Sequence, residues 1–186
     1  MRSWKRVSDL LWLPVGLVVF APIALLIGTA ILLDDGRPLF FLQPRLGLGR
    51  RRFQVIKFRT MRDGRVTRVG ALLRKTGLDE LPQFLNILRG EMSFVGPRPL
   101  TPEDVLRLGW TEPRHDFRWL TRPGITGLAQ VRAGLGARAS LAWDRLYLRR
   151  CGPLLDAGLL ATTFVMNVVG KEPVKRLLLG TCRQWR

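Results

Sequence analysis

The sequence predicts a mixed α/β protein that is mostly helical. A re-entrant membrane helix-break-helix comes first, followed by a small cytoplasmic domain with a short sheet and amphipathic interfacial helices. Three observations support this fold class. The chain carries no charged residue from Leu10 to Leu33 and has Pro22 near the middle of that run. Apolar and polar residues alternate between Phe53 and Phe58, as in a strand. Helical spacing of apolar residues returns in several later segments.

The uncharged run is longer than the ~20 residues that one membrane crossing needs. Basic residues stand on both sides of it, and the positive-inside rule then places both ends on the cytoplasmic side, which one straight crossing cannot do. A proline inside a helix removes a hydrogen bond and kinks or breaks the helix. The arms on either side of Pro22 are each about half a bilayer core in length. A re-entrant hairpin is therefore favoured over a tilted span or a cleaved signal peptide.

The polar part of the chain begins at Gly36. The alternation near Phe58 predicts a short sheet. The residues from 66 to 74 then have their apolar side chains on one side, which predicts a short amphipathic helix. That helix would bring Arg74 close to the motif that follows.

An acidic pair, Asp79 and Glu80, stands out in this basic chain, just ahead of a helix that Pro82 is expected to begin. The start of a helix favours phosphate, because its free amide groups and its macrodipole are positive. Arg74 before the pair and Arg98 in the proline-rich loop after it could hold an anion at the same place. A carboxylate beside an anion site indicates phosphate chemistry.

Two further helices are expected at 141–148 and 154–169. The second is apolar over most of its surface, but polar residues recur in it too often for hydrocarbon, so it should be buried or lie on the membrane surface. The C-terminal residues mix leucines and Trp185 with basic residues, which suits an interfacial anchor on anionic lipid.

The composition points to an anionic partner. The 186 residues include 31 Lys and Arg but only 14 Asp and Glu, a net charge of +17, which suits nucleic acid, an anionic membrane or a phosphorylated substrate. The two cysteines lack C-x-x-C spacing and there is one histidine, so zinc and disulfide roles have no support. The sequence also lacks four common motifs: H-E-x-x-H of zinc proteases, G-x-S-x-G of serine hydrolases, the phosphate loop and the dinucleotide-binding fingerprint.

Four motifs follow one another behind the apolar segment: KFRTM at 57–61, LDELPQ at 78–83, GEMSFVGPRP at 90–99 and RPGITGLAQV at 122–131. In this order they resemble the bacterial sugar transferases, the monotopic phosphoglycosyl transferases that start membrane glycan assembly. The resemblance covers most of the chain. The four motifs together are highly specific, although any one of them alone would be weak.

The resemblance implies an enzyme that moves a sugar 1-phosphate from a UDP-sugar to undecaprenyl phosphate and releases UMP, with Mg²⁺ as cofactor. It implies that Asp79 is the nucleophile, which forms a covalent phospho-sugar intermediate, and that Glu80 supports it; both would hold the metal. The residues expected to bind phosphate or substrate are Arg74, Arg98, Lys57, Arg59, Arg122 and Asp144.

Several of these candidates have a structural alternative. The acidic pair could cap a helix on a solvated face. Arg74 and Arg98 could be solvated or membrane-facing charges. Lys57 and Arg59 could be charges at a strand edge instead of substrate contacts. Arg122 could serve a nucleotide phosphate or a lipid headgroup.

On this resemblance the chain divides into a membrane hairpin at 1–36, a catalytic domain at 37–170 and a basic interfacial tail at 171–186. It would be monotopic on the cytoplasmic face of the bacterial inner membrane, in contact with anionic lipids and without a nucleic-acid partner; the oligomeric state, homodimer or otherwise, stays open. Two alternatives remain. A membrane-anchored nucleic-acid-binding protein would not explain the acidic pair, and a non-catalytic scaffold would not need an intact one.

Overall fold

The computed structural model describes residues 3–132, 136–170 and 174. The tail expected at 171–186 lies outside the described residues, apart from Val174. The elements in chain order are α1 (Ser3–Asp35), β1 (Phe40–Leu46), η1 (Leu48–Arg50), β2 (Arg52–Phe58), β3 (Met61–Arg62), β4 (Arg65–Val66), α2 (Arg68–Thr76), η2 (Leu78–Gln83), α3 (Phe84–Leu88), β5 (Ser93–Val95), α4 (Pro102–Arg107), η3 (Pro113–Leu120), β6 (Gly124–Thr126), α5 (Leu128–Val131), α6 (Gly136–Arg150) and α7 (Pro153–Val169).

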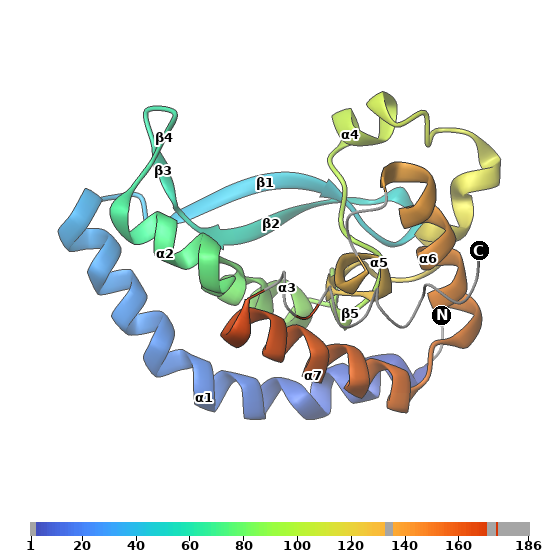
Figure 1. Cartoon of the computed structure of the whole chain (residues 1–186), viewed down its shortest axis with the longest axis horizontal. Coiled ribbons are helices and arrows are strands. Elements are labelled where there is room, and N and C mark those ends of the chain that lie inside the picture. Colours follow the sequence, from blue (N-terminus) through green and yellow to red (C-terminus); the bar gives the residue numbers. More distant parts are fainter. Residues whose placement is uncertain (1–2, 133–135, 171–173, 175–186) are drawn as a thin grey trace.

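Helix α1 runs along one side of the molecule and changes direction part-way along its length (Figure 1). Among the described residues it is the one helix that is long and apolar enough to cross a membrane. The structure corrects the break predicted near Pro22, because α1 is a single helix from Ser3 to Asp35 with that proline inside it. A proline removes only one helical hydrogen bond, and the turns on either side can keep theirs.

The N-terminal end of α1 is fastened to the polar body by charged side chains. The Lys5 ammonium lies 2.7 Å from the Asp156 carboxylate of α7, and both side chains are buried. One carboxylate oxygen of Asp9 accepts hydrogen bonds from the Ser93 hydroxyl at 2.8 Å and from the Phe94 amide at 3.1 Å. These contacts tie the start of α1 to α7 and β5.

The C-terminal end of α1 is fastened to the same body. The Asp35 carboxylate lies 2.7 Å from the Arg59 guanidinium, just beyond β2, and the Asp34 carboxylate accepts a hydrogen bond from the Val69 amide in the first turn of α2. Between its two ends, α1 keeps an outward apolar face. The exposed residues of that face include Leu11, Val18, Leu25, Leu26 and Leu33.

The strand pattern seen in the sequence is confirmed. Strands β1 and β2 pair in antiparallel register, with Phe40 opposite Phe58 and Leu46 opposite Arg52. A second pair, β5 and β6, is parallel and was not predicted. A Cβ atom at Gly124 in β6 would collide with the backbone nitrogen of Gly96, so the close approach of these two segments requires glycine.

The predicted helices near 66–74, 141–148 and 154–169 are present as α2, α6 and α7. Helix α7 buries Leu159 and Met166 in a cluster with residues of β5, α5 and α6. Its outer face leaves Phe164 and Val168 exposed. One face of α7 is therefore buried, as expected, and the other face is apolar and exposed. Contact of that face with a membrane surface stays a prediction. Helix α7 lies beside α1 (Figure 1).

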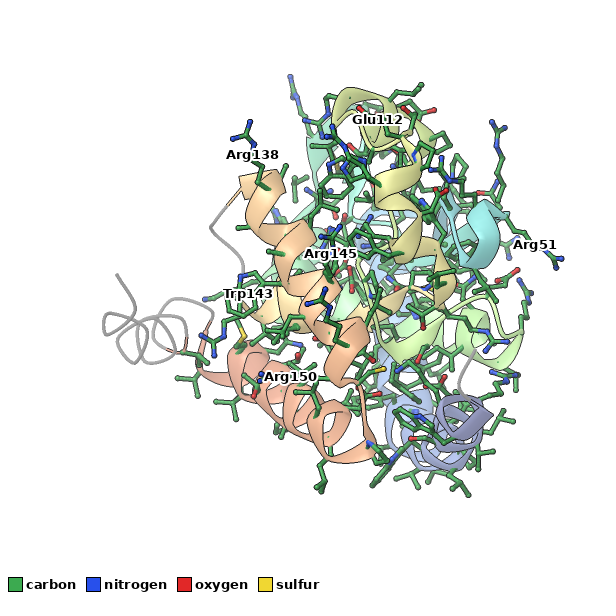
Figure 2. All side chains as sticks on the ribbon, turned by 90° about the vertical axis from the view of Figure 1, so that its right-hand side faces the viewer. Arg51, Glu112, Arg138, Trp143, Arg145 and Arg150 are labelled. Carbon is green, nitrogen blue, oxygen red and sulfur yellow. The ribbon has the colours of Figure 1, made fainter. Side chains whose placement is uncertain are left out.

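The excess of positive charge lies largely at the surface. Arg51 and Arg138 project away from the body in the view of Figure 2. Further arginines of α6, Arg145 and Arg150, are also exposed. A surface of this kind attracts anionic partners at long range.

Candidate active site

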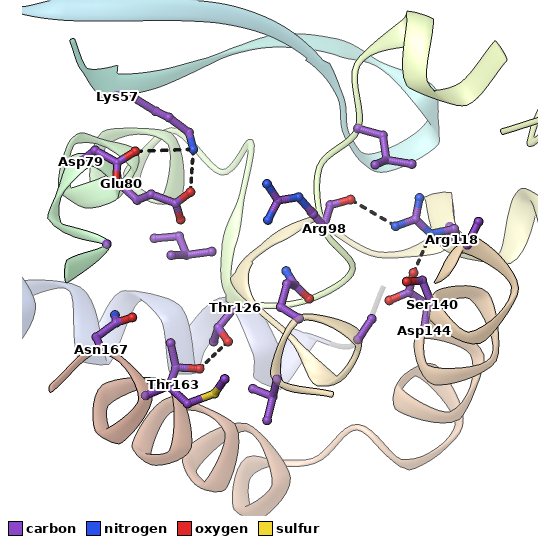
Figure 3. Close-up of a pocket in the computed structure, with 18 of the residues that line it drawn as sticks. Lys57, Asp79, Glu80, Arg98, Arg118, Thr126, Ser140, Asp144, Thr163 and Asn167 are labelled. Carbon is purple, nitrogen blue, oxygen red and sulfur yellow. Dashed lines mark hydrogen bonds and ion pairs between the residues drawn. The ribbon is translucent and has the colours of Figure 1, made fainter. Parts of the chain in front are cut away.

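A cavity of about 740 Å³ lies between α7 and the segments that carry the sequence motifs. Figure 3 shows two groups of charged side chains in it, with the acidic pair on one side and the Arg118–Asp144 pair on the other. Arg98 lies between the two groups. The cavity therefore joins residues from β2, η2, η3, α6 and the loop after β5.

The acidic pair lies within a 3₁₀ helix, η2, which leads directly into α3. Helix α2 ends at Thr76, and the next residue, Gly77, has a positive φ of 75° that turns the chain into η2, with Asp79 and Glu80 in its first turn. The prediction that Pro82 begins the next helix is wrong, because Pro82 lies inside η2 and α3 begins at Phe84. Since both helical pieces are short, the positive charge at this site comes from side chains and not from a helix macrodipole.

Lys57 contacts both acids. Its ammonium donates a hydrogen bond to Glu80 Oε1 at 2.5 Å and lies 4.0 Å from Asp79 Oδ2. The Asp79 side chain is only 15% exposed. Burial raises the pKa of the Asp79 carboxyl, while the positive charge of Lys57 opposes that rise and the negative charge of Glu80 adds to it. Lys57 is thus a cavity residue and not a strand-edge charge.

The two arginines expected to flank the acidic pair both line the cavity. Arg74 is oriented by its Nε, which donates to the Thr60 hydroxyl at 2.8 Å. The side chain of Arg98 is exposed, as expected for a loop that aims it outward, and it reaches the cavity. Together with Lys57 they set three cations against two carboxylates, which favours an anionic ligand.

Asp144 lies on the other side of the cavity, in a buried ion pair. Arg118 Nε donates to its carboxylate at 2.7 Å, and the two side chains are 3% and 2% exposed. Burial raises the pKa of Asp144, and the charge of Arg118 opposes the rise. The Arg118 guanidinium also packs 4.8 Å from the centre of the Trp110 ring. Sequence reasoning missed Arg118, because its partner lies on a distant helix and no motif marks the pair.

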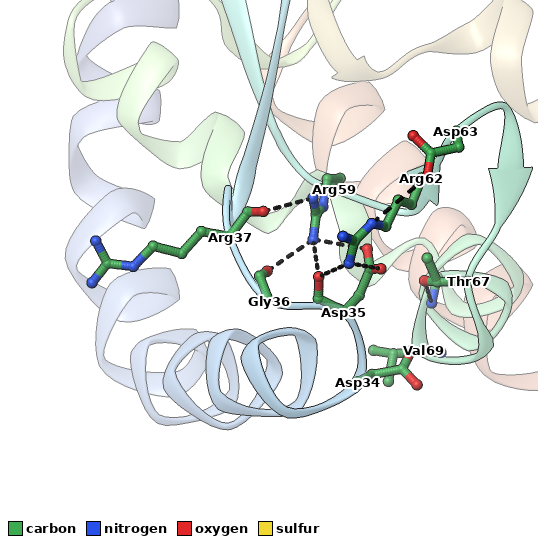
Figure 4. A network of polar contacts seen from close by, with 10 residues as sticks. Asp34, Asp35, Gly36, Arg37, Arg59, Arg62, Asp63, Thr67 and Val69 are labelled. Carbon is green, nitrogen blue, oxygen red and sulfur yellow. Dashed lines mark hydrogen bonds and ion pairs between the residues drawn. The ribbon is translucent and has the colours of Figure 1, made fainter.

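Two predicted phosphate-binding residues do not line the cavity. Arg59 donates to the backbone carbonyls of Asp35 and Gly36 and pairs with the Asp35 carboxylate, so it joins the strand to the end of α1 (Figure 4). Arg122 donates through Nε to the carbonyl of Gly90, just after α3. Both arginines connect elements of the fold in this structure.

Polar residues of α7 form one wall of the cavity. The hydroxyls of Thr163 and Thr126 lie 2.5 Å apart, and Asn167 lies beside Gly77 at the start of η2. The sequence contained a signal for this wall. Thr163 and Asn167 are four residues apart and therefore share one helix face. That spacing predicts a polar stripe along an otherwise apolar helix.

The described residues hold no group of three or more acidic, histidine or cysteine side chains that could bind a metal ion by themselves. Asp79 and Glu80 nevertheless provide adjacent carboxylates at the edge of a basic cavity. Mg²⁺ is commonly bound by one or two carboxylates together with phosphate oxygens of a substrate. The donor set therefore fits a Mg²⁺ ion shared with a phosphorylated ligand.

Comparison with known proteins supports the same family. The model of the family described as "Bacterial sugar transferase" matches residues 1–170. A UDP-glucose:undecaprenyl-phosphate glucose-1-phosphate transferase of Caulobacter vibrioides is 44% identical over 69% of this chain and 53% of its own length. A UDP-N-acetylgalactosamine-undecaprenyl-phosphate N-acetylgalactosaminephosphotransferase of Aeromonas hydrophila is 38% identical, over 82% of this chain and 40% of its own length.

The exopolysaccharide production protein ExoY of Rhizobium meliloti is 37% identical over 82% of this chain and 80% of its own length. The chain spans about half, or less, of the first two relatives but most of the third. The family model covers nearly all of the described structure, including α1, the acidic pair and the cavity. The chain therefore belongs to the bacterial sugar transferase family.

Proposed function

We propose that this protein transfers a sugar 1-phosphate from a UDP-sugar to undecaprenyl phosphate and releases UMP, as an early step of exopolysaccharide or glycoconjugate synthesis. The observation that carries the proposal is the placement of Asp79. Its carboxylate lies at a cavity that also holds Lys57, Arg74 and Arg98. The names of two relatives specify the same donor and acceptor classes.

The proposed reaction has two displacements at one phosphorus atom. An oxygen of ionised Asp79 attacks the β-phosphorus of the UDP-sugar, and the bond to the bridging oxygen breaks, so that UMP leaves with the electron pair. An oxygen of undecaprenyl phosphate then attacks the same phosphorus, and the aspartyl oxygen leaves as a free carboxylate. Splitting the transfer in this way lets a soluble donor and a lipid acceptor use one small site in turn.

The basic side chains offset the charge that opposes this chemistry. A carboxylate and a diphosphate repel each other, so the attack requires cations near the transferred group. Arg74 and Arg98 are available to the phosphates, and Arg74 is oriented by Thr60. Asp79 and Glu80 would hold Mg²⁺, which when bound neutralises phosphate charge. Asp79 makes the covalent bond to phosphorus, and Glu80 supports Asp79 as the second carboxylate that would hold the metal.

The proposed location is the cytoplasmic face of the bacterial inner membrane, with α1 entering and leaving on the same side. Two observations support this topology. Both ends of α1 are fastened to the same polar body, through Asp9 at one end and Asp35 at the other. The outer faces of α1 and α7 are apolar and exposed, which suits contact with anionic lipid bilayers when basic side chains surround them.

The test measures UMP release and lipid labelling by the full chain in membranes, with Mg²⁺, undecaprenyl phosphate and several UDP-sugars labelled in the sugar. Asp79→Asn should reduce both by about 10³-fold or more, because the amide cannot take the place of the carboxylate oxygen that forms the acyl phosphate. Asp63→Asn is the matched control, since Asp63 is exposed in the β3–β4 turn at a left-handed φ that asparagine tolerates. Full activity of Asp79→Asn would refute the assignment of Asp79 as the nucleophile.

A further inference from the structure

The proposed reaction gives no role to one contact of the site, the ion pairing of Lys57 with both Asp79 and Glu80. Its ammonium lies 2.5 Å from Glu80 and 4.0 Å from Asp79, and all three side chains are largely covered. A lysine ammonium is a compact cation on a flexible stem. In this structure the ammonium lies on the carboxylates that a divalent cation would use, and all three side chains line the same cavity.

Two cations cannot use the same carboxylate oxygens without cost. Like charges a few ångströms apart repel each other in a partly covered site, where solvent screens them less than in bulk water. No third acidic, histidine or cysteine side chain joins the pair among the described residues to compensate for a second cation. With Lys57 in place, the pair alone is therefore a poor site for a divalent ion.

A diphosphate ligand changes this balance. Its oxygens supply both the missing ligands for a divalent ion and an alternative partner for the Lys57 ammonium, which lines the same cavity as Arg74 and Arg98. Resting on the proposed function, we infer that Lys57 is a positioning residue that makes metal binding at Asp79 and Glu80 depend on the diphosphate donor. The enzyme would then assemble its metal site only when the substrate is present.

Coupling between metal binding and diphosphate binding can be measured at equilibrium, without turnover. Mn²⁺ serves as the spectroscopic substitute for Mg²⁺, and UDP serves as the diphosphate. Free Mn²⁺ is followed by electron paramagnetic resonance during titration of the full chain in detergent, and the Mn²⁺ that UDP binds by itself is subtracted from a protein-free titration. Because coupling is reciprocal, UDP affinity measured with and without Mn²⁺ must change by the same factor.

The wild type should bind Mn²⁺ weakly alone and about tenfold or more tightly with UDP, within the usual range of coupling. Lys57→Met should bind Mn²⁺ about tenfold more tightly than the wild type without UDP, and UDP should tighten its Mn²⁺ binding by a smaller factor than in the wild type, because only the phosphate ligands and no release of Lys57 contribute. Lys57→Gln serves as a second variant, and Lys57→Arg, which keeps the charge, should restore the coupling. Arg51→Gln removes one exposed charge that does not line the cavity and should behave like the wild type.

Equal Mn²⁺ affinity of Lys57→Met, Lys57→Gln and the wild type in the absence of UDP would overturn the inference. So would tight Mn²⁺ binding by the wild type without UDP, or no Mn²⁺ binding with it. These results are separate from the proposed function. A chain that releases no UMP fails the reaction but still reports on coupling, whereas an active chain whose Lys57 variants bind Mn²⁺ like the wild type fails this inference alone.

Discussion

Arg118 donates a hydrogen bond to Asp144 at 2.7 Å, and both side chains are almost completely buried in the cavity wall. Removing either partner leaves the other charge buried without its counter-ion. Asp144→Leu should therefore lower the free energy of unfolding by about 3–5 kcal/mol. Chemical denaturation of the purified chain measures the change.

The double variant Arg118→Met with Asp144→Leu provides the matching comparison, because it removes both charges together. It should be more stable than Asp144→Leu alone, since replacing a whole buried ion pair by apolar side chains is far less costly than breaking it. Additive costs of the two substitutions would show that the pair is not coupled in the folded state.

The pKa of the Asp79 carboxyl is open to test in the chain without metal. Burial raises this pKa above that of an ordinary aspartate. Carbon-13 NMR of the chain labelled at aspartate, in the presence of a chelator, should therefore show a carboxyl resonance that titrates above the ordinary aspartate range. That resonance should be absent from Asp79→Asn. Titration of the Asp79 resonance at or below the ordinary aspartate pKa would contradict the effect of burial.

The same raised pKa has a consequence for stability. The folded state keeps a proton on Asp79 between the pKa of the unfolded chain and the higher pKa of the folded protein, so stability falls as the pH rises through that window. At neutral pH Asp79 is ionised in both states, and the full loss of folding stability caused by its buried charge is present. Asp79→Asn removes the buried charge and should leave the melting temperature unchanged or higher while activity is lost. A clear fall in melting temperature at pH 7 would mean that the ionised carboxylate stabilises the fold.

The glycines of the RPGITG segment should be intolerant of alanine. A Cβ atom at Gly124 would meet the backbone of Gly96, and a backbone segment in a parallel strand pair cannot move aside cheaply. Gly124→Ala should cost several kcal/mol, on the scale of severe overpacking, and yield little folded protein. Gly158→Ala in α7 is the control, because a Cβ atom there meets nothing within 4 Å and alanine favours helix. Equal stability of the two variants would show that β5 and β6 are not so closely packed.

The proposed topology places both ends of α1 on one side of the membrane. Single cysteines at Ser3 and Arg51, in a chain whose Cys151 and Cys182 are replaced by serine, should both react with an impermeant maleimide in inverted membrane vesicles. Neither should react in intact spheroplasts. Reaction of the two positions from opposite sides would establish a helix that spans the bilayer.

Local sequence patterns were sufficient for much of the fold. The uncharged run marked α1, the alternation near Phe58 marked β2, and helical periodicity marked α2, α6 and α7. Motif order indicated the family. The positions of Arg74 and Arg98 on either side of Asp79 and Glu80 predicted one shared site, and all four residues line the cavity. These features depend on neighbours in the chain, so the sequence carries them directly.

Only the tertiary structure decided how the other charges are used. It turned Lys57 toward the acidic pair and joined Arg118 to Asp144 across distant elements. It also placed Arg59 against the end of α1, although Arg59 stands two residues from Lys57 in the same motif. The identity of a charged residue determines what it can bind, but its direction and its partner are set by how elements far apart in the sequence pack together. Long-range packing of that kind leaves no local pattern to find.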